Sequence, residues 1–135
     1  MKECVFCKIL KGEVPATKVY EDDKTFAFLD LVPVSKGHTL VIPKKHFETM
    51  DEMDEETANA VIKTTQKIAK AILRFNEGYN VNQNNKHAGG QIVPHVHYHV
   101  IPRNEGDGMN HCWKKLDMSN NEITELQNKI QSFLK

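Results

Sequence analysis

The chain has 135 residues, the size of one domain, since a typical domain takes roughly 150 residues. Hydrophobic residues make up 39% of the chain, which is enough to bury a core without stabilising cross-links. Eighteen Lys and Arg balance eighteen Asp and Glu, so no general positive field is present to hold nucleic acid. No apolar run has the length of a membrane span, and the first residues lack the features of a signal peptide. We therefore expect a cytoplasmic protein that binds neither membranes nor nucleic acid.

The first third of the chain combines one short helix with short strands. A turn of helix is expected at residues 5–10. Alternating apolar and polar residues, rich in β-branched and aromatic types, predict strands at residues 17–21, 25–30 and 39–42. Asp22-Asp23-Lys24 joins the first two strands as a hairpin, and Pro43 ends the third.

The longest periodic segment lies in the middle of the chain. Its apolar and small residues recur every three or four positions, at Ala58, Val61, Ile62, Thr65, Ile68, Ala69, Ile72 and Leu73. This spacing is typical of one face of an amphipathic helix. Acidic residues between positions 51 and 56 favour the helix start, and Gly78 marks its end. The pattern predicts one helix of about five to six turns.

The last part of the chain returns to strands before a final helix. Strands are expected at residues 79–83 and 93–101, the second closed by Pro102, with a polar loop at residues 84–90 between them. Ser119-x-x-Glu122 is a capping box for a terminal helix of residues 119–134. That helix carries Ile123, Leu126, Ile130, Phe133 and Leu134. Without repeated βαβ units, the order predicts an α+β domain with an antiparallel sheet over residues 1–135.

Three histidines at alternate positions form the most informative segment. In a strand, His95, His97 and His99 share one face, about 6.6–6.8 Å apart at each step. A half-exposed strand explains the alternation but not the choice of histidine. A His-x-His pair also suits a metal ion. Neutral imidazole is, in addition, a side chain able to attack phosphorus near physiological pH.

The surrounding residues favour the phosphorus chemistry. The strand follows Ala88-Gly89-Gly90, where backbone amides can approach an anion closely. No Asp or Glu lies between Lys86 and Asn104. A phosphate therefore meets hydrogen-bond donors and no fixed negative charge in this segment.

The histidine segment resembles the motif of the histidine triad family, His-φ-His-φ-His-φ-φ with φ hydrophobic. Val96, Tyr98, Val100 and Ile101 fill the four hydrophobic places. The resemblance extends to four further blocks, at residues 4–15, 19–23, 27–30 and 37–46. The chain is thus similar to histidine triad nucleotide-binding proteins over about residues 4–103.

This resemblance implies a sheet of about five strands with one long central helix, and a homodimer whose sheets join. It also implies that His97 is a nucleophile which takes a nucleoside monophosphate from its leaving group. His99 then donates hydrogen bonds to phosphate oxygens, His38 supports the cluster, and His95 lies one step further from the reacting atom.

The resemblance also assigns the nucleotide contacts. Asp30 falls where the family binds the ribose hydroxyls, since a carboxylate accepts two hydrogen bonds. The remaining positions belong to the base and the phosphate, at Phe6, Ile9, Phe28, Asn84, Gly90 and Gln91. From periodicity alone, the apolar members are plain core residues. Ile92 departs from the pattern, because many relatives carry Ser or Thr there, whose hydroxyl can protonate the leaving group.

Three functions remain open at this point. The leading one is a hydrolase of nucleoside phosphoramidates or related AMP and GMP conjugates. A second enzyme function is the cleavage of dinucleoside polyphosphates. The third is a weakly active nucleotide-binding module that works through protein partners, which the missing hydroxyl at Ile92 keeps in consideration.

The Cys4-x-x-Cys7 pair predicts a structural zinc ion. Its spacing is that of half a zinc knuckle, and a reducing compartment makes a disulfide improbable. The resemblance to zinc-bearing members of the wider superfamily implies His46 and His95 as the other ligands. In a competing set, His111 or Cys112 replaces one of these histidines. Two unpaired cysteines and a surface His46 are the simplest alternative.

Overall fold

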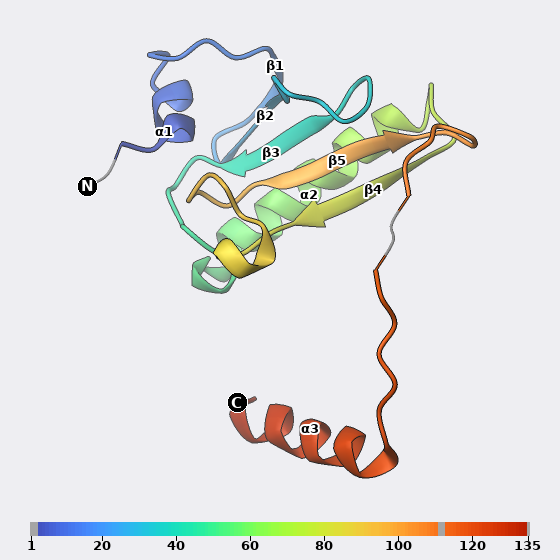
Figure 1. The fold of residues 1–135 in the computed structure, drawn as a ribbon. Helices are drawn as coiled ribbons and strands as arrows, with labels where there is room; N and C mark the ends of the chain where they lie inside the picture. Colours follow the sequence, from blue (N-terminus) through green and yellow to red (C-terminus); the bar gives the residue numbers. More distant parts are fainter. Residues whose placement is uncertain (1–2, 111–112, 135) are drawn as a thin grey trace.

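A computed structural model describes residues 3–110 and 113–134 of the protein. Its centre is a five-stranded antiparallel sheet with the strand order β1-β2-β3-β5-β4 (Figure 1). The strands are β1 (Lys18–Glu21), β2 (Thr25–Leu29), β3 (Thr39–Pro43), β4 (Gly78–Gln83) and β5 (Tyr98–Arg103). The α+β fold expected from the sequence is confirmed.

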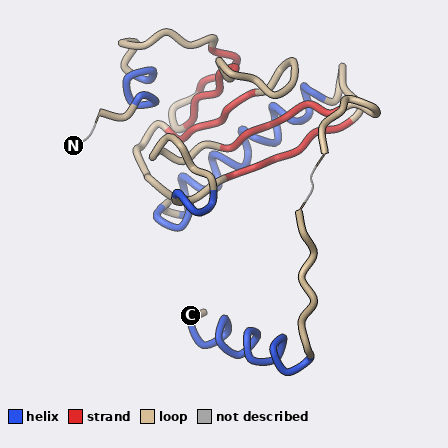
Figure 2. Tube along the Cα trace, in the orientation of Figure 1, coloured by secondary structure: helices blue, strands red, loops and turns tan. Residues whose placement is uncertain are grey.

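Within the part of the chain that the structure describes, three α-helices accompany the sheet (Figure 2). They are α1 (Val5–Leu10), α2 (Glu55–Ile72) and α3 (Asn120–Phe133). Two short 3₁₀ turns, at Met50–Glu52 and His87–Gly89, interrupt the loops. No helix in the described ranges is long and apolar enough to cross a membrane.

The sheet has an apolar core on each face, because its strands alternate. On β2, Ala27 packs with α2, whereas Phe26 and Phe28 pack with α1 on the opposite face. The same alternation continues on β3 with Val41 toward α2 and Leu40 toward α1. The helix α1 therefore covers the face that the histidines of the neighbouring segment share.

The helix α2 begins where Asp54 accepts a hydrogen bond from the Thr57 N–H at 2.8 Å. Its buried side includes Val61, Ile68 and Ile72. Two of the predicted periodic residues lie outside the core, since Ile62 is 46% exposed and Leu73 is 48% exposed. The predicted helix is confirmed. Its apolar side is wider than the strip that packs against the sheet, so some of its apolar residues stay exposed.

Three predicted boundaries are wrong. The helix α2 ends at Ile72, and Gly78 is the first residue of β4 instead of the end of the helix. The strand predicted from residue 93 begins only at Tyr98, because the preceding segment bends: the His95 N–H bonds the Val93 carbonyl at 2.9 Å. The strand β5 also continues past its predicted end. Pro102 lies within it and is paired with Tyr79 of β4, beyond the last residue of β5 that pairs with β3.

The C-terminal helix forms as its capping box predicts. The Glu122 N–H donates to Ser119 Oγ at 3.2 Å, and the Ser119 N–H donates to Glu122 Oε1 at 3.0 Å. In Figure 1, residues 113–119 run away from the sheet as an extended linker and α3 stands apart from the body. Every residue from 119 to 134 is exposed.

Candidate active site

The three histidines are presented on the α1 side of the sheet although only the last of them lies in β5. Val96, Tyr98 and Val100 point into the core under α2. The alternating residues His95 and His97 are buried on the other side, and His99 is half-buried. The face assignment made from the sequence thus survives the wrong start of the strand, because the segment remains extended between its bend and Tyr98.

His97 has one ring nitrogen fixed by the backbone. Its Nδ1 lies 2.7 Å from the carbonyl oxygen of His95, so Nδ1 carries the proton and donates it. The lone pair is then on Nε2. Burial lowers the pKa of His97 below its usual range, against smaller opposing contributions from this hydrogen bond and from Asp30. The ring is therefore neutral, and its Nε2 carries a lone pair that is available at neutral pH.

A hydrogen-bond chain sets the tautomers of the two neighbouring rings. The Val34 N–H donates to His38 Nδ1 at 3.2 Å, so the proton of His38 is on Nε2. That Nε2–H donates to His99 Nδ1 at 2.9 Å. His99 therefore carries its own proton on Nε2. Burial, followed by the rings of His97 and His38, lowers the pKa of His99 to about 4, so this ring is a neutral donor.

Asp30 follows β2 and is held at the same cluster from its other side. One carboxylate oxygen accepts the Val32 N–H at 2.9 Å, and the other lies 3.5 Å from His38 Nε2. The carboxylate is half-buried. It is therefore a fixed acceptor within reach of the histidine cluster, as a group that binds a diol must be.

The three apolar residues expected at the base are all buried in the core under α1. Phe6, Ile9 and Phe28 are between 3% and 8% exposed. The Phe6 ring meets the His97 ring edge to face, with centroids 5.1 Å apart. These residues thus pack the α1 side of the sheet, and Phe6 supports the His97 ring. Their contact with a base remains a prediction.

The loop before the histidines has its backbone fixed by Gln91. Its side-chain oxygen accepts the Lys86 N–H at 2.8 Å, and its nitrogen donates to the carbonyls of Glu48 at 2.7 Å and Val93 at 3.0 Å. The side chain of Gln91 thus holds the loop backbone, and its contact with a phosphate remains a prediction. Gly90, at φ +89°, lies against the Asn84 amide in the same loop.

Lys86 is strained in this loop. Its φ of 65° and ψ of 164° fall in a region that is essentially restricted to glycine. We expect Lys86→Gly to raise the free energy of unfolding by about 1 kcal/mol, because relief of strain exceeds the added freedom of the unfolded chain. Urea unfolding measures this. Lys70→Gly, in an exposed turn of α2, should lower stability by about 1 kcal/mol, and a loss in both variants would contradict the strain.

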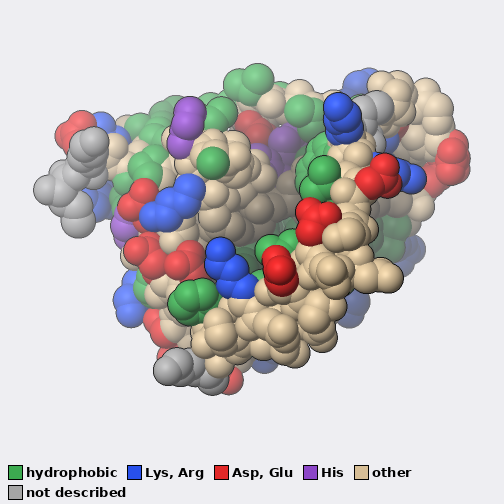
Figure 3. Space-filling view, turned by 60° about the horizontal axis from the view of Figure 1, so that its bottom comes forward, with side chains coloured by type: hydrophobic (Ala, Val, Ile, Leu, Met, Phe, Trp, Pro, Cys, Tyr) green, Lys and Arg blue, Asp and Glu red, His purple; other side chains and the backbone are tan. Residues whose placement is uncertain are grey.

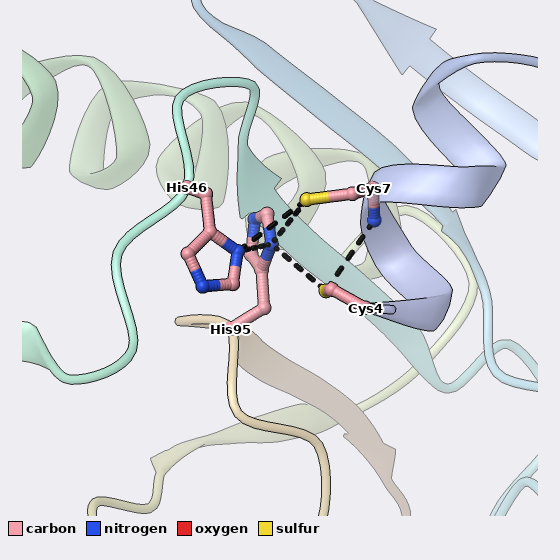
Figure 4. A group of neighbouring side chains, drawn as sticks. All are labelled: Cys4, Cys7, His46 and His95. Carbon is pink, nitrogen blue, oxygen red and sulfur yellow. Dashed lines mark hydrogen bonds between the residues drawn. The ribbon is translucent and has the colours of Figure 1, made fainter. Parts of the chain in front are cut away.

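The four residues predicted as zinc ligands lie together beside α1 (Figure 4). The Nδ1 atom of His95 is 3.4 Å from Cys4 Sγ, 3.7 Å from Cys7 Sγ and 3.1 Å from His46 Nδ1. A tetrahedral ion with Zn–S bonds of about 2.3 Å and Zn–N bonds of about 2.0–2.1 Å places its ligands about 3.3–3.8 Å apart. The donor set and its spacing therefore fit zinc.

The orientation of His95 supports the same conclusion. Its Nε2 lies 2.9 Å from the Pro43 carbonyl and donates to it, which leaves the Nδ1 lone pair directed at the thiols and at His46. His111 and Cys112, the competing ligands, lie outside the described residues.

Comparison with known proteins decides the family. A family model described as the HIT domain matches residues 11–106. The chain belongs to the histidine triad (HIT) family. The adenosine 5'-monophosphoramidase hnt1 of Schizosaccharomyces pombe is 44% identical over 133 residues, which cover 98% of both chains. The family expected from the five sequence blocks is thereby confirmed.

Solved structures of the family show the same fold. The crystal structure of a HIT family member from Bacillus subtilis superposes with a TM-score of 0.92 at 41% identity, covering 99% of both chains. A Zn-bound histidine triad family protein from Mycobacterium smegmatis superposes with a TM-score of 0.76 at 34% identity, covering 96% of both chains.

Proposed function

We propose that this protein is a nucleotide-binding hydrolase that cleaves nucleoside phosphoramidates or related AMP and GMP conjugates. The observation that carries the proposal is the proton arrangement of the cluster. His97 has an available Nε2 lone pair, and the neighbouring His99 has an Nε2–H donor. The Schizosaccharomyces pombe relative is an adenosine 5'-monophosphoramidase, which supports the same substrate class.

The reaction follows from these two nitrogens. His97 Nε2 attacks the phosphorus, a nitrogen–phosphorus bond forms, and the bond from phosphorus to the leaving amine breaks. His99 Nε2–H donates to a phosphate oxygen and stabilises its growing charge. A water molecule then attacks the phosphorus of the nucleotidyl-histidine, the phosphorus–Nε2 bond breaks and the water loses a proton to solvent. The nucleoside monophosphate leaves, and the lone pair returns to His97 Nε2.

The rest of the site would place the nucleotide. Asp30 accepts hydrogen bonds from the ribose hydroxyls, and the backbone at Gly90 and the Asn84 amide lie beside the phosphate. The base rests at the rim of the cluster formed by Phe6, Ile9 and Phe28. Ile92 is 91% exposed and carries no hydroxyl, so the leaving amine takes its proton from solvent. We expect this to slow the release of strongly basic amines.

A turnover screen tests the function. Adenosine and guanosine phosphoramidates, dinucleoside polyphosphates and adenylylated acceptors are each incubated with the protein and with His97→Ala. Phosphoramidates should be cleaved fastest. Preferential cleavage of dinucleoside polyphosphates would favour the second enzyme function instead. A nucleotide that stays bound without turnover for hours would favour the binding module.

The histidine pKa values predict the acid side of the pH profile. Burial lowers the pKa of His97 below 6.5, so protonation removes the nucleophile only at a lower pH. We expect kcat/KM to stay level from pH 8 down to about 6.5 and to fall below that value. Rates between pH 4.5 and 8 with one substrate check this. A fall centred above pH 7 would show that His97 is not held neutral by burial.

We also propose that a zinc ion bound by Cys4, Cys7, His46 and His95 has a structural role. Two thiolates and two imidazoles would fill all four coordination positions of the ion. It would therefore hold its ligands in place but have no open position for a substrate or water. The ligands join α1 to the segment that leads into β5. The site thereby fixes His95, whose carbonyl oxygen orients the His97 ring.

The last part of the proposal is a homodimer. The outer edge of β4 has no partner strand within the described ranges, and Tyr79 and Val81 on it are 40% and 43% exposed. On α2, Ile62 and Leu73 lie on one side of the helix and are also exposed. A two-fold partner covers this edge and this helix side together.

Light scattering should give a mass near twice 15.5 kDa. We expect Ile62→Glu to weaken the dimer at least about a hundredfold, because two-fold symmetry brings both carboxylates into the apolar contact. Lys63→Glu, a quarter turn away on the same helix, is the matched control and should leave the mass unchanged. A wild-type mass of 15.5 kDa at every concentration would refute the dimer.

A further inference from the structure

The loop that joins β2 to β3 is held by hydrogen bonds more than by apolar packing. Leu31, Val32 and Val34 in this loop are 75%, 82% and 55% exposed. The Asp30 N–H donates to the His38 carbonyl at 2.9 Å, which closes the loop at its two ends. Because the apolar side chains between these ends bury little surface, the conformation of the loop depends on its polar contacts.

Ser35 connects this loop to β5, the strand that carries His99. Its half-buried hydroxyl donates to the Pro102 carbonyl at 2.9 Å. The pairing of β3 with β5 ends at Thr39, opposite Val100, so no residue of β3 pairs with Pro102. The Ser35 hydroxyl thus satisfies a carbonyl that the strand pairing does not reach, and it ties the loop to β5 in doing so.

The turn that starts at Ser35 fits closely against the same proline. The Ser35 carbonyl accepts the His38 N–H at 3.1 Å, and Gly37 has a φ of +96°, which is the pattern of a type II turn. A Cβ on Gly37 would lie 3.3 Å from Pro102 Cγ, so a larger residue could not approach the proline as closely. The turn is therefore fixed on Pro102 by the Ser35 hydroxyl and by the close approach of Gly37.

The turn also places a backbone N–H on one ring of the active site. Val34 directly precedes Ser35, and its N–H donates to His38 Nδ1 at 3.2 Å. The His38 ring is only 4% exposed, and Figure 3 shows histidine side chains recessed behind the surface of the molecule. Because a buried ring has few partners to choose from, the Val34 N–H strongly influences which nitrogen of His38 carries the proton.

His38 and His99 can share their protons in two ways. In the first, His38 Nε2–H donates to His99 Nδ1, 2.9 Å away, and His99 keeps its own proton on Nε2. In the second, His99 Nδ1–H donates to His38 Nε2, so that His38 has a proton on Nδ1 and His99 Nε2 has a lone pair. The second arrangement directs the Nδ1–H of His38 at the Val34 N–H, which disfavours it. It also takes the proton from the nitrogen that lies 3.5 Å from the Asp30 carboxylate.

We propose that Ser35 is a positioning residue of the active site, which holds the Val34 N–H on His38 and thereby keeps the proton of His99 on Nε2. The inference rests on the proposed function, in which that proton is donated to a phosphate oxygen. Ser35 acts only through the backbone and through His38. Without its hydroxyl the loop loses its connection to β5, and the arrangement with a lone pair on His99 Nε2 becomes populated. That lone pair repels a phosphate oxygen instead of stabilising it.

Long-range proton–nitrogen NMR spectra of the full chain, recorded at about pH 7.5 where imidazole is neutral, report which ring nitrogen carries the proton. The wild type should show the proton of His99 on Nε2. In Ser35→Ala the two ring-nitrogen shifts of His99 should move toward each other, because the two arrangements exchange. Ser35→Thr keeps the hydroxyl and should restore the wild-type spectrum. Lys36→Ala changes an exposed side chain of the same turn and should leave the spectrum unchanged.

Kinetics of the same variants test the consequence for the reaction. With an adenosine phosphoramidate, Ser35→Ala should lower kcat at least about threefold and leave KM within about twofold, whereas Ser35→Thr and Lys36→Ala should keep the wild-type kcat. Ring-nitrogen shifts of His99 that stay unchanged in Ser35→Ala, or that change without a fall in kcat, would overturn the role of Ser35. A wild type that turns over no substrate, but whose spectra respond to Ser35→Ala as expected, would overturn the proposed function and leave the control of the protons by Ser35 standing.

Discussion

Replacing His97 with alanine is expected to lower turnover of an adenosine phosphoramidate at least about a thousandfold, with nucleotide affinity within a few-fold of wild type. The variant removes the atom that forms the covalent bond. It leaves the other groups of the cluster in place, because His99 is oriented through His38 and Asp30 is held by the Val32 backbone. An effect on kcat with little effect on binding is the signature of a group that acts in the transition state.

The matched control is His87→Ala, which removes an exposed imidazole from the preceding loop. It should keep wild-type turnover. Rapid quenching of the wild-type reaction, followed by mass spectrometry, should find the nucleoside monophosphate on the peptide that contains His97. Substantial turnover by His97→Ala, or an adduct on another residue, would rule out His97 as the nucleophile.

The sequence predicts the faces of the histidine segment better than its hydrogen bonds. Alternation alone places Val96, Tyr98 and Val100 in the core and the histidines opposite, because successive side chains point to opposite faces in any extended backbone. The start of β5 at Tyr98 depends on a bend in which the His95 N–H turns to Val93 and the Val96 N–H bonds the Phe47 carbonyl. Because Phe47 lies 49 residues before Val96 in the chain, the local sequence contains no pattern that predicts this hydrogen bond.

The same distinction explains what was missed at the site. The proton positions that leave a lone pair on His97 Nε2 and an N–H donor on His99 Nε2 depend on backbone atoms of His95 and Val34, whose side chains carry no signal for them. Gln91 is polar and stands next to the glycine loop, so its type suits a phosphate as well as the backbone. Only the three-dimensional structure shows that its amide is already engaged.

Local signals are reliable where the partner is near in sequence. The capping box at Ser119 predicts the start of α3 because both of its hydrogen bonds stay within four residues. The apolar period of α2 likewise predicts the helix, but not which of its residues are covered. Ile62 and Leu73 belong to the pattern and remain exposed, since the period does not distinguish a core from a subunit interface.

The protein purified without added metal is expected to contain one zinc ion per chain, and its removal should lower the melting temperature by more than about 10 °C. The ion connects the N-terminal α1 to residues far along the chain, so its loss releases α1 from the sheet. The buried core under α1, with Phe6 beside the His97 ring, is then opened to water.

Elemental analysis and calorimetry before and after a chelator measure both quantities. Cys7→Ser should lose the metal and the added stability together, because a hydroxyl is a poor zinc ligand. Cys112→Ser is the matched thiol control and should keep both. Loss of zinc in Cys112→Ser with retention in His46→Ala would instead select the competing ligand set.

Less than about a tenth of an equivalent of zinc, with stability unaffected by the chelator, would exclude a structural ion. The four donors would then have to be satisfied without metal. The His46 and His95 rings, whose Nδ1 atoms lie 3.1 Å apart between the two thiols, would then share a hydrogen bond. Since His95 already donates its Nε2–H to Pro43, its Nδ1 would accept a proton from His46 or from a thiol in place of a bond to a divalent ion.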